Sequence, residues 1–274
     1  MQGEGAGGEV AGPSLIKPMM ITQQHPMVRA LLRNRPKIME QKKRMLHHQV
    51  HPYKPFSEVM SDGAWAGQRC FVIGGGPSLE GFNFERLRDK GKIIVANRAY
   101  EWAPFADILF FMDGSNNTFY GLVKNGKLGP VALQSWKDFK GHKVFLNIMG
   151  RQYSDVYSVR SRGSLGISDS LASGLYHGSN SGFGALNLAL TLKANPIYLL
   201  GFDGKFKAGK SHFHSGYGRP IGERTFKSFV RGFERLNQLL KRTNFRVINL
   251  NPDSGIRCFP FMTIDEVLGN GQAG

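Results

Sequence analysis

Short, continuous apolar runs recur along the chain from residue 70 onward, and segments with helical spacing separate them. The runs are residues 70–74, 92–97, 107–113, 131–135, 143–148, 196–203 and 245–250, and the helix candidates lie near 82–90, 116–124, 182–193 and 225–242. Runs that are apolar at every position are typical of a parallel sheet with helices covering both faces. The alternation therefore predicts an α/β fold with a doubly wound, mostly parallel, Rossmann-like sheet.

The N-terminal part of the chain has a different character. Residues 1–25 are rich in Gly and other small residues, so we expect this arm to be disordered when it is alone in water. Residues 26–48 look like two short helices broken at Pro36. We therefore divide the chain into a basic, partly disordered N-terminal extension, residues 1–62, and a Rossmann-like, nucleotide-binding, transferase-like domain, residues 63–274.

The formal net charge of +16 is concentrated in two segments. Residues 29–54 carry eight Lys and Arg against one acidic residue, and residues 205–246 carry eleven against two. Such clustering favours a polyanionic partner, such as nucleic acid, anionic lipid or an acidic protein surface. A solvated surface with a basic tail explains it equally well. The candidate anion contacts are Lys42, Lys43 and Arg44 in the extension and Lys227, Arg231 and Arg235, four apart, on the last predicted helix.

The remaining bulk features favour a cytoplasmic protein. The sequence has no run of 18 apolar residues, so we expect no membrane span, and its first residues lack the layout of a signal peptide. Cys70 and Cys258 show no CxxC spacing, which argues against a zinc site or a disulfide framework. We expect the cytoplasm of a bacterial or phage-infected cell, with a virion as the alternative location.

A glycine-rich turn follows the first apolar run. Gly74, Gly75, Gly76, Pro77 and Ser78 stand where the first strand should end. Glycine lets the backbone approach a ligand closely, and exposed N–H groups can receive phosphate oxygens. Neither GxGxxG nor the Walker A pattern is met. The turn therefore predicts phosphate binding, and a simple tight turn is the alternative.

Polar residues also follow the other predicted strands, whose carboxyl ends should meet at one edge of the sheet. Asp113 could hold a ribose hydroxyl, a sugar or a metal, or could cap the next helix. Residues that open a helix offer N–H groups and a favourable dipole to an anion, although a plain N-cap explains one of them. The candidate ligand-binding residues are Asn97, Ser115, Asn116, Asn180, Ser181, Gly182 and Asp203.

Two histidines, His212 and His214, lie two apart in a loop rich in Gly and Ser. Imidazole titrates near neutrality, so acid–base catalysis is a natural role for either side chain. A metal site would need a third ligand such as Asp203. Ordinary surface histidines in a loop are the remaining alternative.

Taken together, these segments resemble a known family. IGGGPSL after the first strand, ANRAY after the second, FMDGS after the third, and NSGFGALNLAL before a strand that ends in LLGFD follow one pattern. A downstream histidine loop, a long helix and a final strand leading to NPDSG complete it. The pattern is similar to bacterial lipooligosaccharide sialyltransferases and the related motility-accessory-factor glycosyltransferases. Archaeal hydroxymethylpterin pyrophosphokinases share the glycine-rich loop and the acidic end of strand three.

The resemblance covers residues 70–267 and implies a role for each matched position. The glycine turn would approach the nucleotide phosphate, Asn97 and Ser115 or Asn116 would contact the sugar or base, and residues 180–182 would hold the other side. One histidine, with His212 slightly favoured, would be the general base. Two positions depart from the sialyltransferase pattern. The tyrosines that assist the leaving phosphate have only Tyr217 as a candidate, and Asp113 replaces a residue that is usually neutral.

Three functional hypotheses follow. The first is a glycosyltransferase that uses a nucleotide-activated sugar and does not require Mg²⁺. The second is a pyrophosphokinase-like phosphotransferase with Mg²⁺ held by Asp113 and Asp203. The third is a non-enzymatic structural subunit of a nucleic-acid-containing homo-oligomer or larger assembly, such as a phage virion.

Overall fold

The computed structural model describes residues 54–269 except 116, 117, 149, 152 and 215–221. All described residues belong to one compact unit, His51–Gly274. Lys42, Lys43 and Arg44 lie outside the described residues, as do Asn116 and Tyr217. The properties expected of the N-terminal extension, and its boundary at residue 62, therefore stay predictions.

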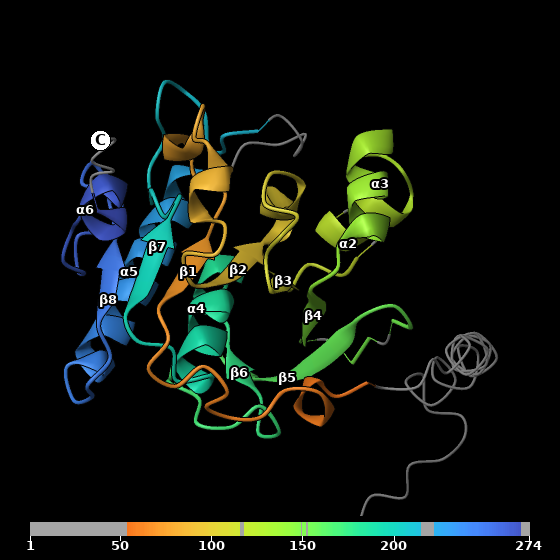
Figure 1. The fold of residues 1–274 in the computed structure, drawn as a ribbon, viewed down its shortest axis with the longest axis horizontal. Helices are drawn as coiled ribbons and strands as arrows, with labels where there is room; N and C mark the ends of the chain where they lie inside the picture. Colours follow the sequence, from red (N-terminus) through yellow and green to blue (C-terminus); the bar gives the residue numbers. More distant parts are fainter. Residues whose placement is uncertain (1–53, 116–117, 149, 152, 215–221, 270–274) are drawn as a thin grey trace, which may run out of the picture. The chain divides into compact units, whose positions relative to one another are not determined.

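The described residues form one parallel sheet of eight strands, which confirms the predicted fold class (Figure 1). The strand order is β6-β5-β4-β3-β2-β1-β7-β8, and every neighbouring pair is parallel. The strands are β1 (Cys70–Ile73), β2 (Lys92–Ala96), β3 (Ile108–Phe111), β4 (His142–Asn147), β5 (Tyr157–Gly163), β6 (Leu175–Tyr176), β7 (Ile197–Leu200) and β8 (Val247–Asn249). Every residue of β1, β3 and β7 is buried, as expected when both faces of a sheet are covered.

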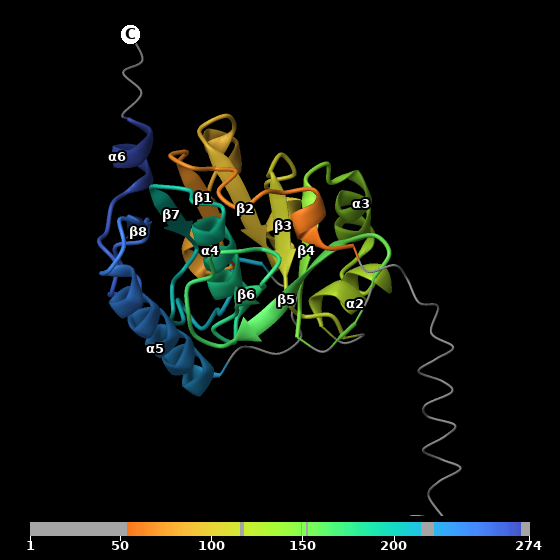
Figure 2. The same ribbon diagram turned by 90° about the horizontal axis from the view of Figure 1, so that it is seen from below.

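Helical segments cover both faces of the sheet. They are the 3₁₀ turns η1 (Phe56–Glu58), η2 (Pro77–Leu79), η3 (Phe84–Leu87) and η4 (Asn97–Glu101) and the helices α2 (Phe119–Lys124), α3 (Pro130–Asp138), α4 (Ser181–Thr191), α5 (Glu223–Leu240) and α6 (Ile264–Leu268). Leu186 of α4 and Phe233 of α5 belong to one buried core, whereas Tyr100 and Trp136 belong to a second. Figures 1 and 2 show α5 and α3 at opposite ends of the sheet. No helix among the described residues is long and apolar enough to cross a bilayer.

The order of the strands places a switch point beside β1. The chain proceeds from β1 through β2 to β6 in one direction and then returns to β7, on the other side of β1. Ile73 and Leu200 are paired at the ends of β1 and β7, so Gly74 and Gly201 leave the sheet next to each other. In open parallel sheets the ligand crevice lies at such a point, beyond the carboxyl ends of the strands.

Three parts of the secondary structure differ from the prediction. Residues 131–135, predicted as a strand, lie in α3, because Pro130 starts the helix and the buried residues Ala132 and Trp136 are spaced four apart. The segment 82–90, predicted as a helix, forms only the 3₁₀ turn η3. β5 and β6 were missed, because β5 has exposed and half-exposed polar residues after its first three positions. The helices near 116–124, 182–193 and 225–242 are confirmed.

Candidate functional site

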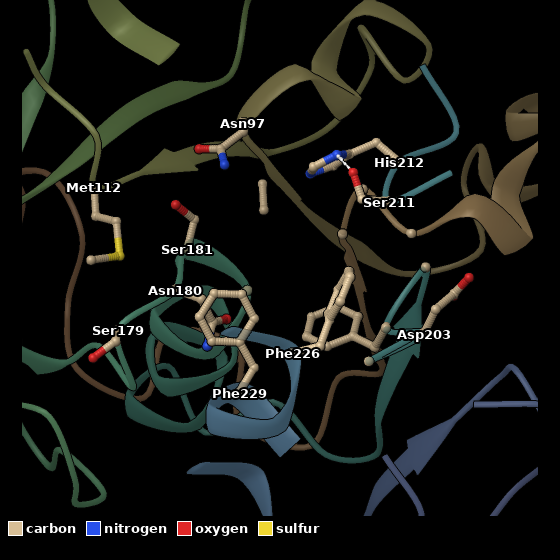
Figure 3. A pocket seen from close by; sticks show the side chains of 18 of the residues that line it. Asn97, Met112, Ser179, Asn180, Ser181, Asp203, Ser211, His212, Phe226 and Phe229 are labelled. Atoms are coloured by element: carbon tan, nitrogen blue, oxygen red, sulfur yellow. Dashed lines mark hydrogen bonds between the residues drawn. The ribbon is translucent and has the colours of Figure 1, made fainter. Parts of the chain in front are cut away.

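A cavity of about 430 Å³ lies beyond the carboxyl ends of β1, β2, β3 and β7 (Figure 3). Its lining contains most of the candidate residues from the sequence: Gly74, Gly75, Gly76, Asn97, Asp113, Asn180, Ser181, Gly182, Asp203, His212 and His214. The glycine turn and the histidine pair, about 140 residues apart in the chain, therefore meet in one place. Pro77, Ser78 and Ser115 are not among the lining residues.

Backbone contacts hold the glycine turn in the switch point. Gly74 N donates to Leu200 O (2.8 Å), and Gly76 N donates to Gly201 O (2.9 Å). A Cβ atom on Gly76 would lie 2.6 Å from both Asp203 Cγ and Gly201 O, whereas one on Gly75 would lie 3.1 Å from His212 Cδ2. Only glycine at residue 76 lets the turn pack this closely against Gly201 and Asp203. Gly75, by contrast, faces the His212 imidazole.

Asp203 locks the glycine turn to the end of β7. Its carboxylate accepts hydrogen bonds from Ser78 N (2.7 Å), Ser78 Oγ (2.5 Å) and Asn251 Nδ2 (3.1 Å). Asp203 is 4% exposed, so these bonds compensate a buried charge. Ser78 and Asp203 were both candidates for ligand contact, and in this structure they hydrogen-bond to each other. Ser115 likewise contacts Thr118, with Ser115 N donating to Thr118 Oγ1 (2.9 Å).

Asn97 Oδ1 and Ser181 Oγ are buried polar atoms in the cavity wall, and neither has a hydrogen-bond partner within the described part of the chain. Asn97 has a positive φ of 52°, uncommon for a residue other than glycine, and Ser181 is 5% exposed. Figure 3 shows both side chains pointing into the cavity. An unpaired buried polar group costs about 1–3 kcal/mol, so both positions fit a wall that is completed by a polar ligand.

The N-terminus of α4 points its first N–H groups at the same cavity. Asn180 caps the helix, and its Oδ1 accepts from Phe183 N (2.8 Å). Ser181 and Gly182, at the first two helical positions, have N–H groups without a partner inside the helix. The helix dipole adds partial positive charge there, which favours a phosphate or carboxylate. Asn180 therefore acts as a plain cap, and the two residues after it offer the donors.

The histidine loop closes over the glycine turn. Phe213 N donates to Gly75 O (3.1 Å), and Ser211 Oγ lies 2.9 Å from His212 Nδ1. Burial lowers the pKa of His212 below its ordinary value of 6.5. The pKa of His214 falls to about 3, because of burial first and then the charges of Arg98 and His212. Both imidazoles are therefore neutral at pH 7.

Asp113 lines the cavity on the β3 side. Burial raises the pKa of its carboxyl group, so the environment disfavours the ionised form. Its backbone oxygen accepts from Tyr120 N (3.1 Å) near the start of α2. Among the described residues, no group of three or more His, Cys, Asp or Glu side chains is arranged to hold a metal ion.

One wall of the cavity is formed by α5, and the sequence analysis did not predict it. Phe226, Phe229 and Phe233 line the cavity together with Phe202 and Ile256. Their spacing along α5 is the pattern of a helix that packs on a core, and Phe233 does pack there. Only the position of α5 over the switch point reveals that the same stripe also borders a cavity.

The opposite face of α5 carries the predicted cations. Lys227, Arg231 and Arg235 are all exposed. Lys227 lies 3.4 Å from Glu223, and such an exposed pair stabilises a helix only slightly. The sequence therefore identified an exposed basic row on the helix whose apolar face borders the cavity.

Comparison with known proteins relates this chain to others through its fold. No protein-family model matches the chain, and no curated protein matches it in sequence. Among solved structures it is similar to the sialyltransferase CstII from Campylobacter jejuni, determined in complex with a substrate analogue, cytidine-5'-monophosphate. The two share 15% sequence identity over 72% of this chain and 86% of that chain, with a TM-score of 0.45. At this level the similarity concerns the fold alone.

Proposed function

We propose that this protein is a glycosyltransferase that binds a nucleotide-activated sugar and transfers the sugar to an acceptor hydroxyl. One observation carries the proposal: the glycine turn, the N-terminus of α4 with the unpaired Ser181 hydroxyl, and the neutral imidazole of His212 line the same cavity. The first two suit a phosphate, and the third suits a general base. The cavity is also large enough for a drug-sized ligand.

Each part of the site has a role in the proposed reaction. The N–H groups of Ser181 and Gly182 and the turn at Gly75 hold the leaving phosphate. His212 takes the proton of the acceptor hydroxyl, the acceptor oxygen bonds to the anomeric carbon, and the bond from that carbon to the phosphate oxygen breaks. The electron pair of that bond leaves with the phosphate. Donors already in place at the phosphate stabilise the charge as it develops, without reorganisation.

The phosphotransferase hypothesis is less well supported by the same residues. It requires Mg²⁺ on Asp113 and Asp203, and magnesium prefers ionised carboxylates with free oxygen positions. The Asp203 carboxylate already accepts three hydrogen bonds, and burial disfavours the ionised form of Asp113. Transfer that does not depend on a metal therefore fits these residues better.

Nucleotide binding tests the proposal. We expect cytidine, uridine or adenosine monophosphate to bind the full chain in isothermal titration calorimetry. Ser181→Ala should weaken the best of them about tenfold, because it removes a hydrogen bond to a charged group. The matched control is Ser228→Ala, at an exposed position of α5. Absence of binding by all nucleoside monophosphates and diphosphates tested, or unchanged affinity in Ser181→Ala, would contradict the proposal.

The basic row on α5 supports a polyanionic acceptor, and we infer single-stranded nucleic acid. Lys227, Arg231 and Arg235 are one helical turn apart, about 6 Å, on the helix that also borders the cavity. A strand lying along this row would have its phosphates facing the cations. Neutralised phosphates release counterions, so such binding depends steeply on salt.

A salt titration measures this contribution. The binding constant K for a 20-nucleotide single strand is measured by fluorescence anisotropy at several salt concentrations. The magnitude of the slope of log K against log salt should be about 2 lower in the triple variant K227Q/R231Q/R235Q than in the wild type. The control, K90Q/K127Q/K137Q, removes three exposed lysines from other elements and has the same net charge. Equal slopes in the two triple variants would show that the α5 row does not contact the strand.

A further inference from the structure

Trp102 connects the surface of the protein to the histidine loop. It directly follows η4 and is 38% exposed, unusually open for an indole. Its ring stacks on that of His214, with centroids 5.7 Å apart and planes at 15°. Phe213 meets the same indole edge-on, with centroids 4.7 Å apart. Trp102 therefore contacts two successive residues of the loop that carries the proposed base.

The stack continues from His214 to His212. Their ring centroids are 5.3 Å apart and their planes are at 27°. Trp102, His214 and His212 thus form a row of three rings, which we call the ring row, and His212 lies at its cavity end. Gly75 lies beside both imidazoles, because a Cβ atom there would lie 3.1 Å from His212 Cδ2 and 3.9 Å from His214 Nε2. The base therefore lies next to both the glycine turn and His214.

The turn that presents Trp102 is itself rigidly held. Arg98 and Glu101 form an ion pair, with Arg98 Nη2 2.7 Å from Glu101 Oε2 and side chains that are 10% and 7% exposed. The Arg98 guanidinium carbon lies 5.8 Å from the centre of the Trp102 ring. The same turn begins with Asn97, whose Oδ1 faces the cavity. One short turn thus supports both the cavity wall and the outer end of the ring row.

We propose that Trp102 is a positioning residue that acts through His214 to hold His212 in place over Gly75. This inference rests on the proposed function, in which His212 is the base. Without the indole, His214 loses the ring that stacks on it, whereas Phe213 keeps its hydrogen bond to Gly75 O, its ring contact with Phe84 and its packing against the second core. Within the described residues, the charged or titratable groups that act on His214 are Arg98 from η4 and His212 from its own loop. A purely structural indole would change stability but not the behaviour of these imidazoles.

The histidines report on this role without any substrate. NMR titration of the imidazole protons in the full chain should show that Trp102→Ala moves the pKa of His214 upward from about 3 toward 6.5, because water reaches the ring. Trp102→Phe should stay close to the wild type, since it keeps an aromatic ring. Val131→Ala, at a position that is 71% exposed on α3, is the control and should change nothing.

Kinetics complete the test. Trp102→Ala should lower kcat about tenfold and leave nucleotide affinity unchanged, and Trp102→Phe should restore most of the loss. An unchanged histidine titration in Trp102→Ala overturns the inference. A fall in kcat that is fully explained by a lower melting temperature of the variant overturns it as well. The proposed function fails separately, if nucleotides do not bind or no sugar is transferred while the histidine titration still responds to Trp102→Ala.

Discussion

Replacing His212 by alanine is expected to lower the rate of sugar transfer by about 10²–10⁴-fold, the usual contribution of a general base. The imidazole lines the cavity, is neutral at pH 7 and sits next to Gly75. Its removal leaves the phosphate-binding end of the site intact, so the affinity for a nucleoside monophosphate should not change. Single-turnover kinetics with a radiolabelled nucleotide sugar would measure the loss.

The pH dependence and the second histidine provide the controls. Burial lowers the pKa of His212 below 6.5, so the base loses its neutral form only below that pH, and the acidic limb of the rate profile should lie there. His214→Ala should have a smaller effect than His212→Ala, because His214, with a pKa of about 3, is a poor base. If transfer is unchanged in His212→Ala, or is lost only in His214→Ala, then His212 is not the base.

Substitution of Gly76 by alanine is expected to destabilise the fold strongly. The new Cβ would lie 2.6 Å from Gly201 O and from the Asp203 carboxyl carbon, and neither can move without breaking the contacts that lock the turn. We expect the free energy of unfolding to fall by about 2–4 kcal/mol. The midpoint of thermal unfolding, measured by calorimetry, should fall by about 5–15 °C.

Two other glycines separate stability from function. In Gly75→Ala the new atom meets side chains alone, His212 Cδ2 at 3.1 Å and His214 Nε2 at 3.9 Å, so the fold should lose about 1 kcal/mol or less while transfer falls sharply. Gly222 has a φ of −72°, and no atom of the described residues lies within 4 Å of an added Cβ, so both properties should stay near the wild type in Gly222→Ala. Equal stability of Gly76→Ala and Gly222→Ala would show that the switch-point turn is not tightly packed.

Local patterns predicted the sheet well because a buried parallel strand has a local signature. β1, β3 and β7 are apolar at every position, and each was found within three residues of its ends. The same rule failed at α3, where the run VAL is apolar but Val131 is 71% exposed and the buried residues Ala132 and Trp136 are spaced as in a helix. It also missed β5, whose exposed side chains resemble those of a loop.

The candidate site was recovered in part. Residues that end strands were predicted to converge, and Gly75, Ser181 and His212 do line one cavity. The sequence could not separate residues that face the cavity from those that support it. Ser78 and Asp203 are 125 positions apart, and only the folded chain shows that they bond to each other. Phe229 has the spacing of a core residue, and nothing in that spacing indicates a cavity wall.

The sequence by itself determined the fold class and the set of polar and glycine residues at the ends of the strands. These features depend on residues that are close in the chain. A continuous apolar run indicates a buried strand, and a glycine allows the backbone angles of a turn at its own position. The tertiary structure alone decided that β7 lies beside β1, that Asp203 locks the glycine turn, and that Trp102 stacks on the histidine loop. Those contacts join segments about 100 or more residues apart, and they form only when the whole sheet brings the segments together.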